Sequence, residues 1–260
     1  MKILFIGDIV GQPGRRSLTY WVPRLREEFA LDFIVANAEN SAGGLGATPE
    51  TINAILSTGV NAITLGNHTW RKRSLVKGIE LYANVVRPAN YANGAPGRGS
   101  TIVELDDGRA VGLVNVLGRV FMEPQACPFE AARAEVARLK ETTSTILVDV
   151  HAEATAEKVA MGWFLDGTCS AVLGTHTHIQ TADERVLPGG TAYITDVGMT
   201  GPMDGVIGVE RDAIIRKFLT GMPTEFVTSK ARPGLNGVVI ETDDETGKAL
   251  SIERVARIDG

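Results

Sequence analysis

The sequence predicts an α/β protein built on mixed β-sheet, and three features of the chain support this. Near the amino terminus, three short apolar segments alternate with two helical segments. Residues 144–174 repeat the order strand, helix, strand, and a hairpin signal lies between the two halves. Strands that alternate with helices build parallel sheets with helices on their faces, whereas a hairpin adds an antiparallel strand.

In the first half of the chain, hydrophobic spacing separates strands from helices. The apolar run from Lys2 ends at Gly7-Asp8, and residues 15–29 carry apolar side chains at helical intervals. Thr48 is suited to cap the next helix and Pro49 to occupy its first position. We therefore expect strands at 2–7, 33–37 and 62–65 and helices at 15–29 and 48–56.

The second half continues with a hairpin over residues 100–115, because Asp106-Asp107-Gly108 separates two apolar segments. The further expected elements are helices at 130–140, 154–165 and 210–219 and strands at 144–150, 171–174, 192–195, 237–242 and 250–257. Residues 198–208 read as a glycine-rich loop. No linker-like segment interrupts the chain, so one domain over residues 1–260 is expected.

Composition narrows the class of protein. Of the 260 residues, 44% are hydrophobic and 22% are charged, as in an average globular protein. The formal net charge is −5 and no basic block occurs, so we expect no binding of long nucleic acid. The absence of a long apolar run and of a secretion signal predicts a cytoplasmic protein without membrane contact.

Polar residues follow nearly every expected parallel strand. They are Asp8, Glu39, Asn40, Asn67, His68, His151, His176 and His178. Ligands of open α/β sheets bind outside the carboxyl ends of the strands, where residues distant in sequence converge. A lone histidine is more often structural than functional, but all four histidines of this chain fall at these ends. The pattern therefore predicts a functional site at one sheet edge.

The donor atoms of this set indicate a metal site. Carboxylate, amide oxygen and imidazole without thiolate suit Mn²⁺, Fe²⁺ or Zn²⁺ and differ from the cysteine set of a structural zinc site. Seven of these eight residues, all but His68, are candidate ligands, which is more than one tetrahedral ion needs. Two ions roughly 3.5–4 Å apart, sharing one carboxylate, would account for the number, and Glu39 is the natural bridge.

The same residues carry a family resemblance. Gly7-Asp8, Asn37 to Asn40, Gly66 to His68, the strand end at His151, and Gly174 to His178 resemble the metal-binding motifs of calcineurin-like metallophosphoesterases. Together with GDIVGQPGR, VDVHAEATAEK and DVGMTGP, they resemble the YmdB-like branch in particular. The resemblance implies a four-layer α/β/β/α fold with mixed sheets, phosphodiesterase activity on 2′,3′-cyclic nucleotides, and a homo-oligomer, often a tetramer.

The resemblance also implies roles for the site residues. The first metal would be held by Asp8, Glu39, Asn40 and His178, and the second by Glu39, Asn67, His151 and His176. The broad superfamily begins Asp-x-His, but here Val10 replaces that histidine, and Asn40 is the best placed substitute. Iron is the first expectation, then manganese, with zinc also compatible. His68 would protonate the leaving oxygen during in-line attack by a hydroxide that bridges the metals.

Two other functions stay open from the sequence. The same metals would serve a phosphomonoesterase, including a protein phosphatase, because both reactions use in-line chemistry. Alternatively, the chain could be a regulatory, RNA-associated protein whose metal site is vestigial, although a complete ligand set argues against this. Metal content and turnover of a cyclic nucleotide beside a monoester would separate these functions.

Overall fold

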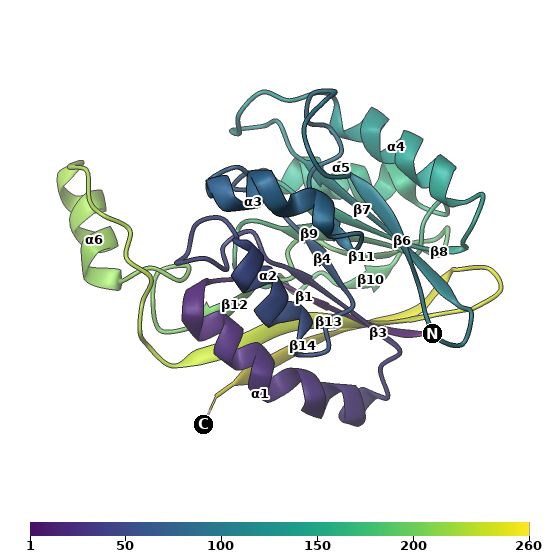
Figure 1. Cartoon of the computed structure of the whole chain (residues 1–260), viewed down its shortest axis with the longest axis horizontal. Coiled ribbons are helices and arrows are strands. Elements are labelled where there is room, and N and C mark those ends of the chain that lie inside the picture. Colours follow the sequence, from purple (N-terminus) through teal and green to yellow (C-terminus); the bar gives the residue numbers. More distant parts are fainter. Residues whose placement is uncertain (260) are drawn as a thin grey trace.

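The computed structural model describes residues 1–259, and in this part of the chain two mixed β-sheets pack face to face between layers of helices (Figure 1). The four-layer α/β/β/α arrangement expected from the sequence is therefore confirmed. Three separate apolar clusters fill the three spaces between the layers. The middle cluster includes Phe5 and Phe33 from one sheet and Leu113, Leu147 and Leu173 from the other.

The larger sheet contains eight strands within residues 1–259. They are β1 (Lys2–Ile6), β2 (Asp8–Ile9), β3 (Phe33–Asn37), β4 (Ala62–Thr64), β5 (Val85–Val86), β12 (Met199–Pro202), β13 (Pro233–Thr242) and β14 (Ala249–Ile258). β1, β3, β4 and β5 are parallel neighbours, and β13 pairs antiparallel with β1, β12 and β14. The carboxyl ends of β1, β3 and β4 consequently lie at one edge.

The smaller sheet has the order β10-β11-β9-β8-β7-β6. Its strands are β6 (Ser100–Glu104), β7 (Ala110–Leu117), β8 (Thr145–His151), β9 (Ala171–Thr175), β10 (Arg185–Val186) and β11 (Ala192–Ile194). β7, β8, β9 and β11 run parallel, and β6 and β10 are antiparallel edge strands. This sheet therefore also presents a row of parallel carboxyl ends.

Helices cover the outer face of each sheet. The larger sheet packs against α1 (Gly11–Phe29), α2 (Pro49–Leu56), α3 (Arg73–Gly78) and the 3₁₀ turn η1 (Ile79–Leu81), while α4 (Pro128–Leu139) and α5 (Thr155–Leu165) cover the smaller one. α6 (Arg211–Thr220) instead projects away from the body of the molecule (Figure 1). Within residues 1–259, no helix is both long and apolar enough to cross a membrane.

Most expected elements are confirmed, and the differences have local causes. The hairpin forms with Gly108 at a φ of +87°, which its turn requires. α1 begins at Gly11, a turn before its expected start, because Pro13 is acceptable in a first helical turn. The expectation of a glycine-rich loop at 198–208 was wrong in part, since β12 pairs there with β2 and β13. The single-domain expectation stays a prediction.

The layer between the sheets should dominate stability. Leu147 is fully buried there, so Leu147→Ala removes apolar contacts and leaves a cavity. We expect the free energy of unfolding to fall by about 2–5 kcal/mol. Leu81→Ala is the control, because this leucine is 83% exposed and its truncation should cost at most about 0.5 kcal/mol. Denaturant titration of both variants measures the difference, and equal losses would contradict the assignment.

Candidate metal centre

The candidate residues form one connected cluster at the edge where the carboxyl ends of both sheets meet. Asp8, Glu39, Asn40, Asn67 and His68 follow or begin strands of the larger sheet, whereas His151, His176 and His178 belong to or follow β8 and β9. Contacts of 2.8–3.9 Å between polar atoms join all eight side chains directly or through a neighbour in the set. The structure thus brings together every site residue expected from the sequence.

Glu39 lies at the centre of the cluster and is fully buried. Its Oε1 lies 3.1 Å from His151 Nε2 and 3.2 Å from His68 Nδ1, and it accepts a hydrogen bond from the Asn40 amide at 3.1 Å. Its Oε2 accepts the backbone N–H of His68 at 3.0 Å. This central carboxylate is therefore placed to face both halves of the cluster.

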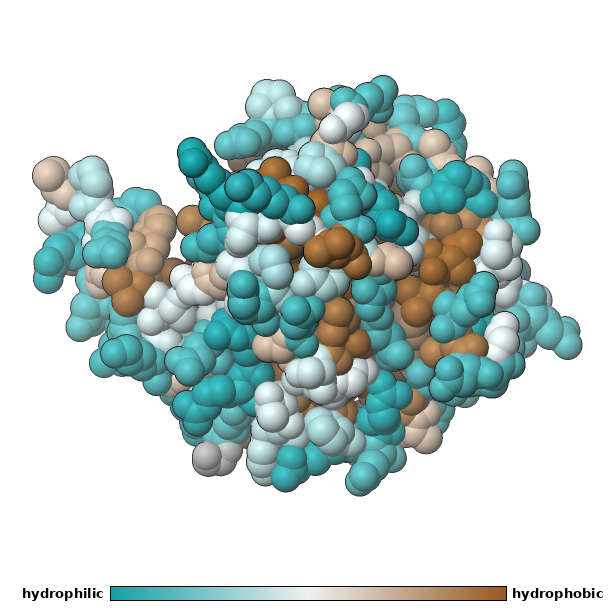
Figure 2. Space-filling model, in the orientation of Figure 1, coloured by the Kyte–Doolittle hydropathy of each residue, from teal (hydrophilic) through white to brown (hydrophobic). Residues whose placement is uncertain are grey.

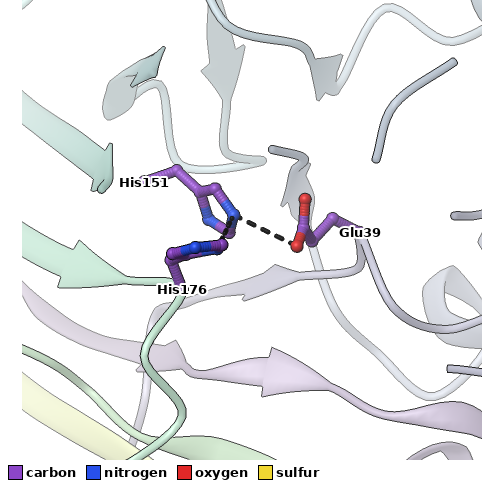
Figure 3. A group of neighbouring side chains, drawn as sticks. All are labelled: Glu39, His151 and His176. Carbon is purple, nitrogen blue, oxygen red and sulfur yellow. Dashed lines mark hydrogen bonds and ion pairs between the residues drawn. The ribbon is translucent and has the colours of Figure 1, made fainter. Parts of the chain in front are cut away.

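One half of the cluster gathers around His151. Figure 3 shows the His151 ring directed at Glu39, with His176 beside it. His151 Nε2 lies 3.0 Å from His176 Nδ1 and 3.0 Å from Asn67 Oδ1. One ligand atom each from Glu39, His151 and His176 lies within 4.8 Å of the others, a spacing that a single metal ion could span.

The other half contains Asp8, Asn40 and His178. His178 Nε2 lies 3.2 Å from the Asn40 amide nitrogen and 3.9 Å from Asp8 Oδ1. Asp8 Oδ2 accepts the backbone N–H of His176 at 3.1 Å, but Asp8 Oδ1 is buried without a hydrogen-bond partner among residues 1–259. An unpaired buried carboxylate oxygen is costly unless a cation meets it. Oxygen and nitrogen donors around such an atom fit a divalent metal ion.

Asn40 and Val10 show how the missing histidine is accommodated. The Val10 side chain is buried against Gly201 and Gly208. Asn40 directs its amide nitrogen toward Glu39 and His178 and its oxygen toward His68 Nδ1, at 2.8 Å. A ligand role for Asn40 needs its oxygen on the side of His178. The amide would therefore have to turn over when a metal binds.

Burial and neighbouring charges raise the pKa values of some groups in the cluster and lower those of others. Burial raises the pKa of Asp8 to about 6 despite the nearby His178 and His151. Burial alone would raise the pKa of Glu39, but His151 and His68 hold it well below its usual value. Burial opposes charge on His151, yet Glu39 and Asp8 raise its pKa to about 9. Burial and His151 lower the pKa of His176 to about 3.

A second layer of side chains orients the histidines, and the sequence analysis missed it. Asp149 accepts a hydrogen bond from the Thr175 hydroxyl at 2.7 Å, which leaves that oxygen free to accept Nδ1–H of His151 at 2.8 Å. On the far side, Glu153 Oε2 lies 3.2 Å from His176 Nε2. Such partners fix the ring and the tautomer of a ligating histidine. His151 thereby presents Nε2, and His176 presents Nδ1, to the cluster.

Gly66 and Asp196 also belong to the site region. A Cβ at Gly66 would lie 2.3 Å from Glu39 Oε2 and 2.4 Å from His151 Nε2, so this position requires glycine. Asp196 accepts the backbone N–H of Thr177, between two candidate ligands. A signal for Asp196 was present, because it follows the strand end at β11 as the other candidates follow theirs.

Comparisons with known proteins show which family and which relatives this chain resembles. A family model described as YmdB-like protein matches residues 4–255. The chain is 48% identical over 255 residues to the 2′,3′-cyclic-nucleotide 2′-phosphodiesterase of Bacillus subtilis, covering 98% of this chain and 96% of the relative. A crystal structure from Mycoplasma pneumoniae, described as a novel phosphatase, is 35% identical with a TM-score of 0.93 and covers 99% and 93% of the two chains.

A more distant structure is informative about the fold alone. The calcineurin-like phosphoesterase YfkN of Bacillus subtilis is 16% identical, with a TM-score of 0.59 over 99% of this chain and 90% of that chain. The two-sheet sandwich of this chain is therefore that of the calcineurin-like phosphoesterases.

Metal affinity should depend on pH through the cluster. A metal at His151 Nε2 must displace the proton that Glu39 stabilises there up to about pH 9. We expect the apparent affinity of the metal-free protein for Mn²⁺ to rise about tenfold per pH unit between pH 7 and 9. Below about pH 6, protonation of Asp8 should steepen the loss. Calorimetric titration across this range measures the slope, and an affinity independent of pH would contradict it.

Proposed function

The chain belongs to the YmdB-like protein family, and we propose that it hydrolyses 2′,3′-cyclic nucleotides with the help of two divalent metal ions. The observation that carries this proposal is the convergence of oxygen and nitrogen donors from five strand ends on the buried carboxylate of Glu39. The name of the Bacillus subtilis relative supports the substrate class, because that protein is 48% identical over nearly its whole length.

The distances support a division of the cluster into two metal positions. Asp8, Glu39, Asn40 and His178 would hold the first ion, and Glu39, Asn67, His151 and His176 the second. The donors are oxygen and imidazole nitrogen, whereas Cys169 is buried away from the cluster beside Leu165 and Ala171. This set favours iron or manganese, and zinc is compatible. Bound ions would supply a hydroxide nucleophile at neutral pH and neutralise charge on the phosphate oxygens.

His68 is the histidine available for proton transfer. Its Nδ1 lies 2.8 Å from Asn40 Oδ1 and 3.2 Å from Glu39 Oε1. With the Asn40 amide turned over for a metal, the amide N–H would face Nδ1, and the ring proton of a neutral imidazole would then lie at Nε2. Its Nε2 has no hydrogen-bond partner among the described residues 1–259, and the side chain is partly exposed. Proton exchange with a bound substrate would therefore take place at Nε2. Donation from this atom to the departing ribose oxygen is the role that we propose.

Phosphomonoester hydrolysis is the second candidate function. The Mycoplasma pneumoniae structure with a TM-score of 0.93 is described as a novel phosphatase, and the same cluster could act on a monoester. The RNA-associated role with a vestigial site is disfavoured, because every expected ligand is present and in contact with the cluster.

Turnover measurements test the proposed function directly. Metal-replete protein should hydrolyse a 2′,3′-cyclic nucleotide faster than a nucleoside monophosphate, and a chelator should abolish both activities.

The Glu39→Gln variant tests the central carboxylate. It should reduce metal content and activity together while the fold persists, because it removes the central charge that faces both metal positions. Faster turnover of the monoester would favour the phosphatase, and full activity of Glu39→Gln would refute the assignment of Glu39.

The role of His68 can be separated from metal binding. We expect His68→Ala to keep its metal ions and to lower kcat on a cyclic nucleotide by about 10²–10⁴-fold, the range for loss of a general acid. A nitrophenyl phosphodiester expels a leaving group that needs little protonation, so the same variant should be much less impaired on it. Loss of metal, or equal impairment on both substrates, would exclude the general-acid role.

We further propose that the chain self-associates, with a tetramer expected, and that it acts in the cytoplasm. Residues 206–228 around α6, here called the arm, support the proposed self-association. Bridges of Val209 to Val206 and to Thr228 close the base of the arm. Phe218 and Leu219 are each 81% exposed on it, and Figure 2 shows apolar surface there. Apolar surface on a projecting element is typical of subunit interfaces.

The free thiols Cys127 and Cys169 are compatible with a reducing compartment, such as the proposed cytoplasm.

Light scattering after size-exclusion chromatography tests this assembly. Phe218→Asp should shift the protein toward the monomer, because a carboxylate cannot be buried unpaired in an apolar interface. Leu81→Asp is the matched control, since Leu81 is similarly exposed but lies on η1, outside the arm. A wild-type protein that is monomeric at every concentration would refute self-association, and equal effects of both variants would refute the role of the arm.

A further inference from the structure

A buried ion pair lies beneath the loop that carries His176 and His178, and the proposed chemistry does not use it. Lys158 of α5 donates from Nζ to Asp196 Oδ2 at 2.8 Å, and both side chains are fully buried. Lys158 Nζ also lies 3.2 Å from the Thr177 hydroxyl oxygen. The pair therefore reaches the one residue that separates the two histidines.

The loop above this pair has an unfavourable backbone conformation. His176 has a φ of +91° and His178 a φ of +65°, and both values lie in the left-handed region that residues with a Cβ rarely adopt. Such conformations persist only where surrounding contacts hold them, and they are frequent at functional sites. The contacts that hold this loop are therefore a condition for the positions of both imidazoles.

Asp196 supplies two of these contacts, both at Thr177. Its Oδ2 accepts the backbone N–H of Thr177 at 3.1 Å and the Thr177 hydroxyl at 2.6 Å, in addition to Lys158. Its Oδ1 accepts the backbone N–H of Gly198 at 2.7 Å, which ties the carboxylate to the segment entering β12. The loop is fixed from below at Thr177, between its two strained residues.

Stability alone does not account for such a pair. Removing two charges from water has a large desolvation cost, and buried ion pairs often contribute less to stability than apolar residues of similar volume. A fully buried pair whose hydrogen bonds end on one strained loop is better explained by the geometry it imposes there.

We propose that Lys158 and Asp196 are positioning residues, which act through Thr177 to hold His176 and His178 in the geometry for binding two metal ions. The inference rests on the proposed function, in which His178 serves the first ion and His176 the second. One rigid loop then carries a ligand for each ion. Relaxation of this loop should weaken both positions together, whereas loss of a single ligand should affect mainly one.

Three variants test the proposal through metal binding. Lys158→Met keeps the length of the side chain but removes its charge, and Thr177→Val removes the hydroxyl that both charged groups contact. We expect each to bind Mn²⁺ about 10–100-fold more weakly than wild type in calorimetric titration of metal-stripped protein, as for loss of an outer-shell partner. Thr177→Ser restores the hydroxyl and should bind Mn²⁺ nearly as tightly as wild type.

Leu139→Ala is the control for general destabilisation. Leu139 is fully buried at the end of α4, against Gly112 and outside the cluster, so its truncation should lower the unfolding midpoint and leave Mn²⁺ affinity unchanged. Equal losses of affinity in Leu139→Ala and Lys158→Met would overturn the proposal. If Lys158→Met does not fold, the comparison of Thr177→Val with Thr177→Ser decides the question.

A crystal structure of Lys158→Met, or of Thr177→Val, keeps this test separate from the proposed function. We expect His176 and His178 to leave the left-handed region in the variant, and an unchanged loop with unchanged Mn²⁺ affinity would overturn the positioning role. Wild-type protein that binds Mn²⁺ without hydrolysing cyclic nucleotides would refute the substrate but not the positioning role. Wild-type protein that binds no Mn²⁺ would refute the metal site, and the loop conformation alone would then decide.

Discussion

Packing of one sheet on the other is the constraint on which the site depends. The apolar layer between the sheets fixes β1, β3 and β4 against β8 and β9, so that two rows of parallel carboxyl ends meet at one edge. Neither sheet alone supplies enough ligand atoms for the proposed two-metal site, since the larger contributes the carboxylates and amides and the smaller contributes three histidines. Contacts such as that between Glu39 and His151 exist only because packing holds the two sheets in this relative position.

The candidate site residues could be predicted from the sequence because each one lies at or just past the end of a strand. Such strands can be recognised from the hydrophobic pattern of a few neighbouring residues. Asp8 and Glu39 each lie two residues past the end of a buried strand, and this position alone marks them as site candidates. The fold class followed from the same periodicity. The resemblance to calcineurin-like enzymes then supplied the four layers and the division of ligands, which spacing along the chain does not contain.

The supporting residues could not be found in this way, because their roles arise from tertiary contacts. Asp149 lies inside β8, where a hydrophobic pattern gives no sign that it reaches Thr175 on the next strand. β12 was missed because its pairing with β2 and β13, and not the propensity of its glycine-containing sequence, makes it a strand. Lys158 would be placed on the solvent side of a helix by its charge, but it turns inward to Asp196.

The depth at which each cluster side chain is buried agrees with the role proposed for it. Asp8, Glu39 and His151 are fully buried, whereas the side chains of His178, His176 and His68 are 11%, 19% and 20% exposed. An unpaired carboxylate charge is most costly at the buried positions, so a cation would be most stabilising there. The Asp8 oxygen without a hydrogen-bond partner among residues 1–259 lies at that depth. A phosphate can approach only from the exposed side. His68 is partly exposed and keeps a nitrogen without a partner among residues 1–259, so in the proposed function it would lie on the side from which the phosphate approaches.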